Sequence, residues 1–164
     1  MIDRQELAVI HTKNHYQSPK EVTWNDMIDK LSYEFDNDNP KFIIDALETF
    51  DVSLRGIRAL HSNVPPTFVC HTDYYPGAFL NAFNEVKNYS EMHVYCSLGK
   101  KSLTFGNHKD DVDVLLVQSV GKITYDIEGK IYNLNPGDSL FIPSGTYHNP
   151  IITQPRITLS FSNE

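Results

Sequence analysis

Apolar and polar positions along the chain follow two different periods, and the change comes near residue 65. Before that point, apolar residues recur at the spacing of three and four that gathers them on one face of a helix. After it, short runs alternate between apolar and polar residues, which is typical of strands. The pattern therefore predicts a mostly helical segment over residues 1–65 and a β-barrel core over residues 66–164, within a single domain.

The N-terminal segment is expected to hold three helices. The first covers residues 23–35, where Thr23 and Asp26 have the spacing of a helix-capping pair. The second is predicted over residues 40–50, because Pro40 is tolerated at the first helical position. The third is predicted over residues 52–60. The buried face of the first helix is expected to carry Trp24, Met27, Ile28 and Leu31.

The C-terminal part is expected to consist of short strands, interrupted by one helix over residues 77–86. A hairpin turn is predicted around Gly129, and another turn at Pro136-Gly137. Many short strands with regular turns favour a sandwich or a barrel. The strands are predicted over residues 67–72, 91–98, 101–107, 112–120, 122–134, 138–144 and 156–162.

Composition and charge exclude several classes of function. The net charge of −7 argues against binding nucleic acid through a broad basic face. No apolar run approaches the ~20 residues that span a bilayer, and the first residues do not have the pattern of a signal peptide. Cys70 and Cys96 lack the paired spacing of a zinc site. They are expected to be reduced, partly buried thiols, and the protein is expected to be cytoplasmic.

The candidate chemistry lies where charged residues run directly into an apolar strand. His108 and Asp110 precede the apolar run of residues 112–120. Two residues apart on a strand, they would point an imidazole and a carboxylate toward the same place. His148, the one later histidine, would complete a set of two histidines and one carboxylate, which is the facial triad of non-haem Fe(II) oxygenases. The alternative is an exposed acidic turn before a core strand.

Two segments, "HKDDVDVLLVQSVG" and "LNPGDSLFIPSGTYH", carry a more specific signal. They resemble the jumonji-C oxygenases, in particular the ribosomal-oxygenase branch, which belongs to the cupin superfamily. The resemblance covers about residues 90–162 and implies a mainly β fold, a double-stranded β-helix with an N-terminal helical segment. The matching positions are His108, Asp110, Asp113, Val114, Gln118, Gly121, Leu134, Pro136, Gly137, Asp138, Pro143, Gly145 and His148.

The resemblance implies an Fe(II)- and 2-oxoglutarate-dependent oxygenase. Fe(II) would be held by His108, Asp110 and His148. Decarboxylation of the keto acid to succinate would accompany hydroxylation of a C–H bond, in either a small molecule or a protein. Asp111 and Asp113 are not ligands in this motif, and we expect both to tolerate replacement by alanine.

The sequence departs from the family pattern at the anchor for the far carboxylate of 2-oxoglutarate. Relatives place a lysine or arginine where this chain has Ile123, and Lys122 would need a strand bulge to face inward. Arg156 on the last strand is the favoured replacement, because a guanidinium binds a carboxylate through two hydrogen bonds. Tyr95 and Thr104 are the expected helpers, or else ordinary strand residues.

Ile123 keeps a second function open, since the triad alone also fits a metal-binding cupin that does not use 2-oxoglutarate. Such a protein would be a binding or sensing module, or would have another metal-dependent activity. Other polar residues are expected to be structural or to lie at the surface: His11, His15, His61, His71, His93 and Asp138.

Overall fold

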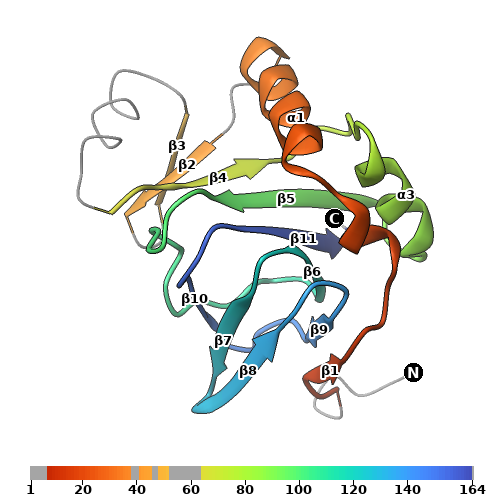
Figure 1. Cartoon of the computed structure of the whole chain (residues 1–164). Helices are drawn as coiled ribbons and strands as arrows, with labels where there is room; N and C mark the ends of the chain where they lie inside the picture. Colours follow the sequence, from red (N-terminus) through yellow and green to blue (C-terminus); the bar gives the residue numbers. More distant parts are fainter. Residues whose placement is uncertain (1–6, 38–40, 46–47, 52–63, 164) are drawn as a thin grey trace.

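The computed structural model of the chain describes residues 7–37, 41–45, 48–51 and 64–163, and its strands far outnumber its helices (Figure 1). The mainly β prediction is therefore confirmed. In chain order the elements are β1 (Ile10–Thr12), the 3-10 helix η2 (Ser18–Glu21), α1 (Trp24–Asn37), β2 (Lys41–Asp45), β3 (Glu48–Asp51), β4 (Thr67–Cys70), α3 (Ala78–Glu85), β5 (Glu91–Ser97), β6 (Val114–Val120), β7 (Ile123–Ile127), β8 (Lys130–Leu134), β9 (Ser139–Ile142), β10 (Asn149–Ile151) and β11 (Arg156–Ser162).

The strands form two antiparallel sheets. The larger sheet has eight strands in the order β1-β9-β6-β11-β5-β4-β2-β3, and the smaller has three in the order β10-β7-β8. Strand β11 lies in the middle of the larger sheet, hydrogen-bonded to β5 on one side and β6 on the other. Helices α1 and α3 lie on the side of the larger sheet away from the smaller one (Figure 1).

The two faces of the larger sheet bury two separate apolar clusters, because alternate residues of a strand point to opposite faces. The outer cluster packs α1 and α3 against the sheet and includes Leu115 and Leu159. The inner cluster fills the space between the two sheets and includes Leu116 from β6 and Ile123 from β7. Neighbouring residues of β6 thus contribute to different cores, and the inner face is free to line a pocket between the sheets.

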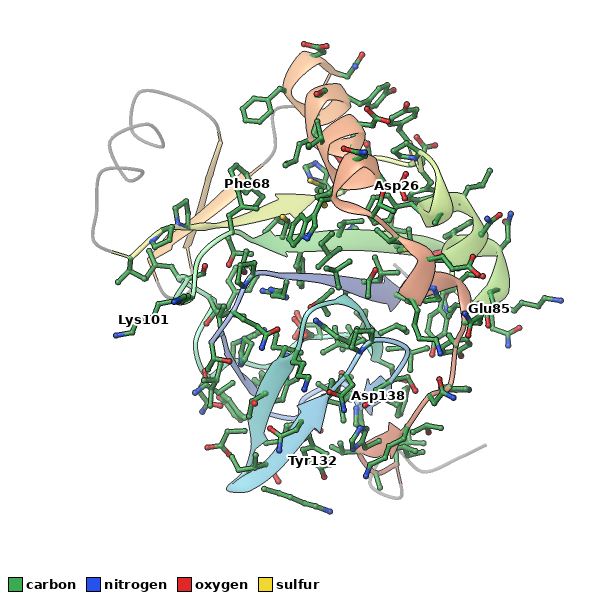
Figure 2. All side chains as sticks on the ribbon, viewed as in Figure 1. Asp26, Phe68, Glu85, Lys101, Tyr132 and Asp138 are labelled. Atoms are coloured by element: carbon green, nitrogen blue, oxygen red, sulfur yellow. The ribbon has the colours of Figure 1, made fainter. Side chains whose placement is uncertain are left out.

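Helix α1 begins at the predicted cap. Thr23 N–H donates to Asp26 Oδ2 at 3.0 Å, and Asp26 N–H donates to Thr23 Oγ1 at 3.1 Å. Asp26 Oδ2 also accepts a hydrogen bond of 3.4 Å from the N–H of Ala78, so this carboxylate joins the start of α1 to the start of α3 (Figure 2).

The buried face of α1 differs from the prediction. Met27 is buried and Leu31 packs on the outer cluster, but Trp24 and Ile28 are 38% and 58% exposed. Lys30 and Glu34, one helical turn apart, are instead fully buried, and Lys30 forms part of the buried face.

The ammonium of Lys30 lies 3.2 Å from Glu34 Oε1 and donates to the carbonyl oxygens of Thr72 and Tyr74. Glu34 Oε1 in turn accepts from Thr72 N–H and Oγ1–H. Burial lowers the pKa of Lys30, and the nearby Glu34 carboxylate opposes that shift. This pair replaces part of the apolar face because its hydrogen bonds satisfy most of its polar atoms.

The helix predicted over residues 40–50 is wrong, since β2 and β3 form an antiparallel hairpin there. Residues 42–44 are Phe-Ile-Ile, which also suit a strand, and β4 offers an edge to which β2 pairs. The sequence pattern here fits a helix and a strand equally well, and pairing with β4 decides in favour of the strand. The helix predicted over residues 52–60 lies outside the described residues.

Most of the other predicted elements are confirmed, including helix α3, strands β4, β5, β6, β9 and β11, and the β7–β8 hairpin. The hairpin turn has positive φ at both Glu128 and Gly129, as a two-residue type I′ turn requires. The strand predicted over residues 101–107 is wrong, because that segment is irregular. Thr104 Oγ1 accepts the N–H of Gly106 at 3.0 Å, a local turn that competes with strand pairing.

Both cysteines are free, as expected, and both are fully buried rather than partly buried. Among the described residues, no helix has the length and apolar character needed to cross a membrane.

Replacing Lys30 with methionine should destabilise the protein by about 3–5 kcal/mol, because the Glu34 carboxylate would stay buried without its cation. Chemical denaturation measures the loss. The control is Asp29→Ala at an exposed position of the same helix, which should have little effect. Replacing Glu34 with leucine in the Lys30→Met protein should recover part of the stability, since no buried charge then remains. A double variant no more stable than Lys30→Met would contradict this account.

Candidate metal centre

His108 and His148 are held side by side by their own backbones. His108 N–H donates to His148 O at 3.0 Å, and His148 N–H donates to His108 O at 2.8 Å. This isolated antiparallel bridge brings the two ring centroids to 4.3 Å. The strand expected to carry His108 and Asp110 is absent, and a single backbone bridge, rather than strand alternation, positions His108 beside His148.

Asp110 reaches the histidines from a loop that is clamped to the turn before His148. Its carbonyl oxygen accepts Gly145 N–H at 2.8 Å. Ser144 strengthens the clamp, because its hydroxyl donates to Asp111 O at 2.9 Å and its N–H donates to Asp113 Oδ1 at 2.8 Å. Asp113 therefore has a structural role that the sequence did not reveal.

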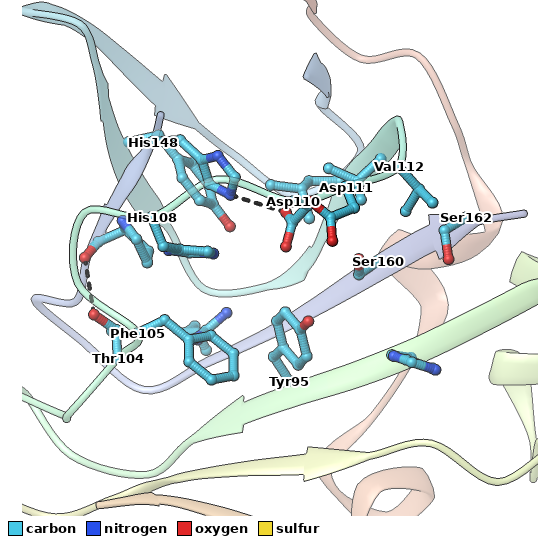
Figure 3. A pocket seen from close by; sticks show the side chains of 16 residues that line it. Tyr95, Thr104, Phe105, His108, Asp110, Asp111, Val112, His148, Ser160 and Ser162 are labelled. Carbon is cyan, nitrogen blue, oxygen red and sulfur yellow. Dashed lines mark hydrogen bonds and ion pairs between the residues drawn. The ribbon is translucent and has the colours of Figure 1, made fainter. Parts of the chain in front are cut away.

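The donor atoms of His108, Asp110 and His148 all lie within 4.8 Å of one another, and no other such cluster occurs in the described part of the chain. Asp110 Oδ2 is 3.3 Å from His148 Nε2 (Figure 3). Two ligands at right angles on an octahedral metal, each ~2.1 Å from it, are roughly 3.0 Å apart. The spacing between Asp110 and His148 therefore fits two ligands of a small divalent cation after a minor contraction.

Both imidazoles present the nitrogen that a metal needs. His108 Nδ1 lies 2.8 Å from the carbonyl oxygen of Gly106, and His148 Nδ1 lies 2.9 Å from that of Thr146. A carbonyl only accepts, so each Nδ1 carries a proton. In the neutral rings, each Nε2 then has a free lone pair for a metal.

The electrostatics of the cluster favour the metal-binding protonation states of His108 and Asp110. Burial lowers the pKa of His108, with the nearby His148 acting in the same direction, so the ring of His108 is neutral at neutral pH. Burial by itself would raise the pKa of Asp110. The hydrogen bond and the charge of His148, with the charge of His108, outweigh burial and lower it. Asp110 is therefore an ionised carboxylate.

The three side chains border a cavity of about 300 Å³ between the sheets, at the small end of the range for small-molecule sites. In Figure 3, the cavity runs past the triad along β11 toward Ser160 and Ser162. Three ligands on one side of a metal would leave its other positions facing this space. The lining residues are His93, Tyr95, Thr104, Phe105, His108, Asp110, Asp111, Val112, Val114, Leu116, Tyr125, His148, Pro150, Arg156, Ser160 and Ser162.

Arg156 lines the cavity and is only 2% exposed. Its Nε–H donates to Ser97 Oγ at 2.9 Å, its Nη1 has no hydrogen-bond partner, and no carboxylate among the described residues pairs with it. The guanidinium lies over the ring of Tyr95, 5.8 Å from the centroid. Burial lowers the pKa of Arg156, yet a guanidinium stays protonated in proteins. The cavity therefore contains a positive charge without a counter-ion.

Lys122 does not line the cavity and is exposed, while Ile123 is buried in the inner cluster. A bulge does occur nearby, since Ile157 pairs with Val120 and Thr158 pairs with Gln118. The bulge lies in β6, before the turn, and it does not bring Lys122 inward.

Tyr95 and Thr104 both line the cavity (Figure 3), but the Thr104 hydroxyl donates to Pro150 O at 3.5 Å and accepts from Gly106 N–H. Two further residues line the cavity that the sequence motif did not indicate, Phe105, whose ring lies 5.3 Å from that of His108, and Tyr125. Burial raises the pKa of Tyr125 to about 12. Tyr125 could have been found from strand alternation, because it shares a face with the buried Ile123.

No protein-family model and no curated protein sequence matches the chain. Solved structures of YcfD, a ribosomal oxygenase from Escherichia coli, match its fold. The complex of YcfD with cobalt and succinic acid has a TM-score of 0.69 and 14% identity, covering 95% of this chain and 48% of YcfD. The complex with cobalt and 2-oxoglutarate has a TM-score of 0.64 and 14% identity, covering 96% and 48%.

This likeness confirms the ribosomal-oxygenase type of fold that the motif indicated, in a chain that spans about half the length of YcfD. At such low identity the comparison concerns the fold alone. The cobalt, succinic acid and 2-oxoglutarate belong to the YcfD crystals.

Replacing Asp110 with alanine should weaken Fe(II) or Co(II) binding by more than about 100-fold, since even an outer-shell partner of a metal ligand is worth ~10–100-fold. Anaerobic calorimetry measures the affinity. The matched control is Asp111→Ala, which removes an adjacent carboxylate but leaves the ligand set and the Asp111 carbonyl in place. Asp113→Ala should have an intermediate effect, because Ser144 N–H loses its acceptor. Equal losses for Asp110→Ala and Asp111→Ala would refute the assignment.

Proposed function

We propose that this protein is an Fe(II)- and 2-oxoglutarate-dependent oxygenase that hydroxylates a C–H bond of its substrate. The observation that carries the proposal is the content of one cavity. A His-Asp-His cluster and a buried guanidinium with a free Nη1 line the same space of about 300 Å³. A metal chelator with a distant carboxylate is complementary to both groups.

The donor set fits the metal. His108, Asp110 and His148 would hold Fe(II) as two neutral imidazoles and one carboxylate, a set used by non-haem iron oxygenases. The bound metal, with 2-oxoglutarate and dioxygen, supplies decarboxylation of the keto acid to succinate coupled to hydroxylation of a C–H bond. The backbone bonds of both Nδ1 atoms keep the two rings oriented before any metal arrives.

The free guanidinium supports the choice of a diacid. A buried cation without a counter-ion costs several kcal/mol, and a ligand carboxylate would remove most of that cost. Arg156 would bind the second carboxylate of 2-oxoglutarate. Ile123 cannot do so, because its side chain offers neither a charge nor a hydrogen bond to a ligand. The guanidinium lies over the ring of Tyr95, and the apolar side chains of Leu116 and Phe105 line the same cavity and would help to exclude water from it.

Ile123 also favours a second candidate, a metal-binding cupin that does not use 2-oxoglutarate. Its side chain is 1% exposed and belongs to the inner cluster, so the position that holds a cation in the relatives is apolar here. Such a protein would bind the same metal through the same three residues. Its cavity would bind a different anion at Arg156.

The two candidates differ in their response to 2-oxoglutarate. The Fe(II)-loaded protein should develop a visible charge-transfer band with 2-oxoglutarate under anaerobic conditions, and should release succinate once air is admitted. If it neither binds 2-oxoglutarate nor releases succinate, the cupin alternative holds.

Arg156→Met should weaken 2-oxoglutarate binding by roughly 10–100-fold, since a hydrogen bond to a charged group is worth about 1.5–3 kcal/mol. The matched control is Lys122→Met, which removes an exposed charge outside the cavity and should leave the affinity unchanged. Thermal melting of each variant shows whether it remains folded, and Fe(II) titration shows whether its metal site is intact. A loss of 2-oxoglutarate affinity can then be attributed to the lost anchor. If Lys122→Met lost 2-oxoglutarate binding and Arg156→Met did not, the assignment of the anchor to Arg156 would be wrong.

A further inference from the structure

Three residues form a row across three adjacent strands of the larger sheet. Arg156 on β11 lies directly opposite Ser97 on β5, and Ser97 lies directly opposite Thr67 on β4. Directly opposed residues of antiparallel strands point to the same face, so the three side chains are neighbours on the inner face. All are buried, with Ser97 and Thr67 fully so.

The hydrogen bonds along this row run in one direction. Thr67 Oγ1 lies 2.6 Å from Leu103 O, and because a carbonyl cannot donate, the Thr67 hydroxyl must. At its 2.9 Å contact with Ser97, Thr67 Oγ1 can therefore only accept the Ser97 proton. Ser97 Oγ then offers its lone pairs to Arg156 Nε–H at 2.9 Å. Each bond polarises the next, so the chain is stronger than its separate members.

This chain orients the guanidinium without neutralising it. The bond at Nε fixes the plane of the group, while Nη1 keeps no partner. An aspartate in place of Ser97 would hold Arg156 equally well, but it would form an ion pair and cancel the charge. Two neutral hydroxyls leave the whole positive charge available to a ligand in the cavity.

The far end of the chain is fixed to backbone. Leu103, whose carbonyl accepts from Thr67, donates its own N–H to Pro65 O at 2.9 Å. The next two residues, Thr104 and Phe105, line the cavity. The row thus links the guanidinium to the irregular segment that forms the cavity wall beside His108.

We propose that Thr67 and Ser97 are positioning residues, which aim the Arg156 guanidinium and so give the cavity its preference for dicarboxylate over monocarboxylate 2-oxo acids. This inference rests on the proposed function, because it takes Arg156 as the site that receives the second carboxylate of the keto acid.

The experiment compares two probes on the Mn(II)-loaded protein, 2-oxoglutarate and 2-oxobutanoate, which lacks the second carboxylate. Calorimetry gives the affinity for each. Thr67→Val and Ser97→Ala should each bind 2-oxoglutarate about 5–10-fold more weakly, the loss expected for one buried hydrogen bond of the chain. Binding of 2-oxobutanoate should not change. Thr67→Ser keeps a hydroxyl and should retain the wild-type preference.

Thr124→Val is the matched control, because among the described residues its hydroxyl bonds to Asn133 on the exposed face of the β7–β8 hairpin, away from the row. A general loss of structure would weaken both probes and lower the melting temperature, so either variant that stays folded can decide the question. If wild type prefers 2-oxoglutarate and the folded variants keep that preference, the positioning role is wrong and the proposed function stands. If wild type shows no preference, the carboxylate anchor fails and the inference falls with it.

Discussion

The alternation of side chains along β11 is the constraint on which both the fold and the site depend. The strand is buried over its whole length and bonded on both sides. Ile157, Leu159 and Phe161 enter the outer cluster beneath the helices, while Arg156 and Ser160 face the cavity. A slip of one residue would bury a guanidinium among the apolar side chains under α1 and turn Leu159 into the cavity. The outer cluster therefore fixes the register that points Arg156 inward.

The candidate metal site is built from backbone more than from side-chain packing. The reciprocal bridge between His108 and His148 sets the distance between two ligands, and the bond from Gly145 N–H to the Asp110 carbonyl brings in the third. The same backbone supplies the carbonyls that hold both Nδ1 protons. Ligands fixed in this way are preorganised, so a metal need not order them on arrival.

The same cavity contains two unsatisfied features. At the triad, Asp110 Oδ2 lies 3.3 Å from His148 Nε2. A proton or a metal cation must lie between these two atoms, because their lone pairs would otherwise repel each other. At Arg156 a positive charge is held by neutral partners only. Buried groups of this kind reduce stability unless a ligand completes them. Burial of the two apolar clusters supplies stability that offsets the cost of these buried groups. The hydrogen-bond chain through Ser97 and Thr67 keeps the guanidinium in place.

The sequence by itself determined the elements whose signals are local. The Thr23–Asp26 cap, the Gly129 hairpin and the periods of strands β4, β5, β6, β9 and β11 depend on neighbouring residues. The ordered motif from His108 to His148 indicated the fold and the three metal-ligand candidates. Tertiary structure decided the rest, because pairing and burial join distant segments. An available edge of β4 turned residues 41–45 into a strand, and the acceptors at Thr72 and Tyr74 drew a lysine into the core. Only the register of β11 against β5 could show that Arg156 meets Ser97 and faces the cavity without an acidic partner.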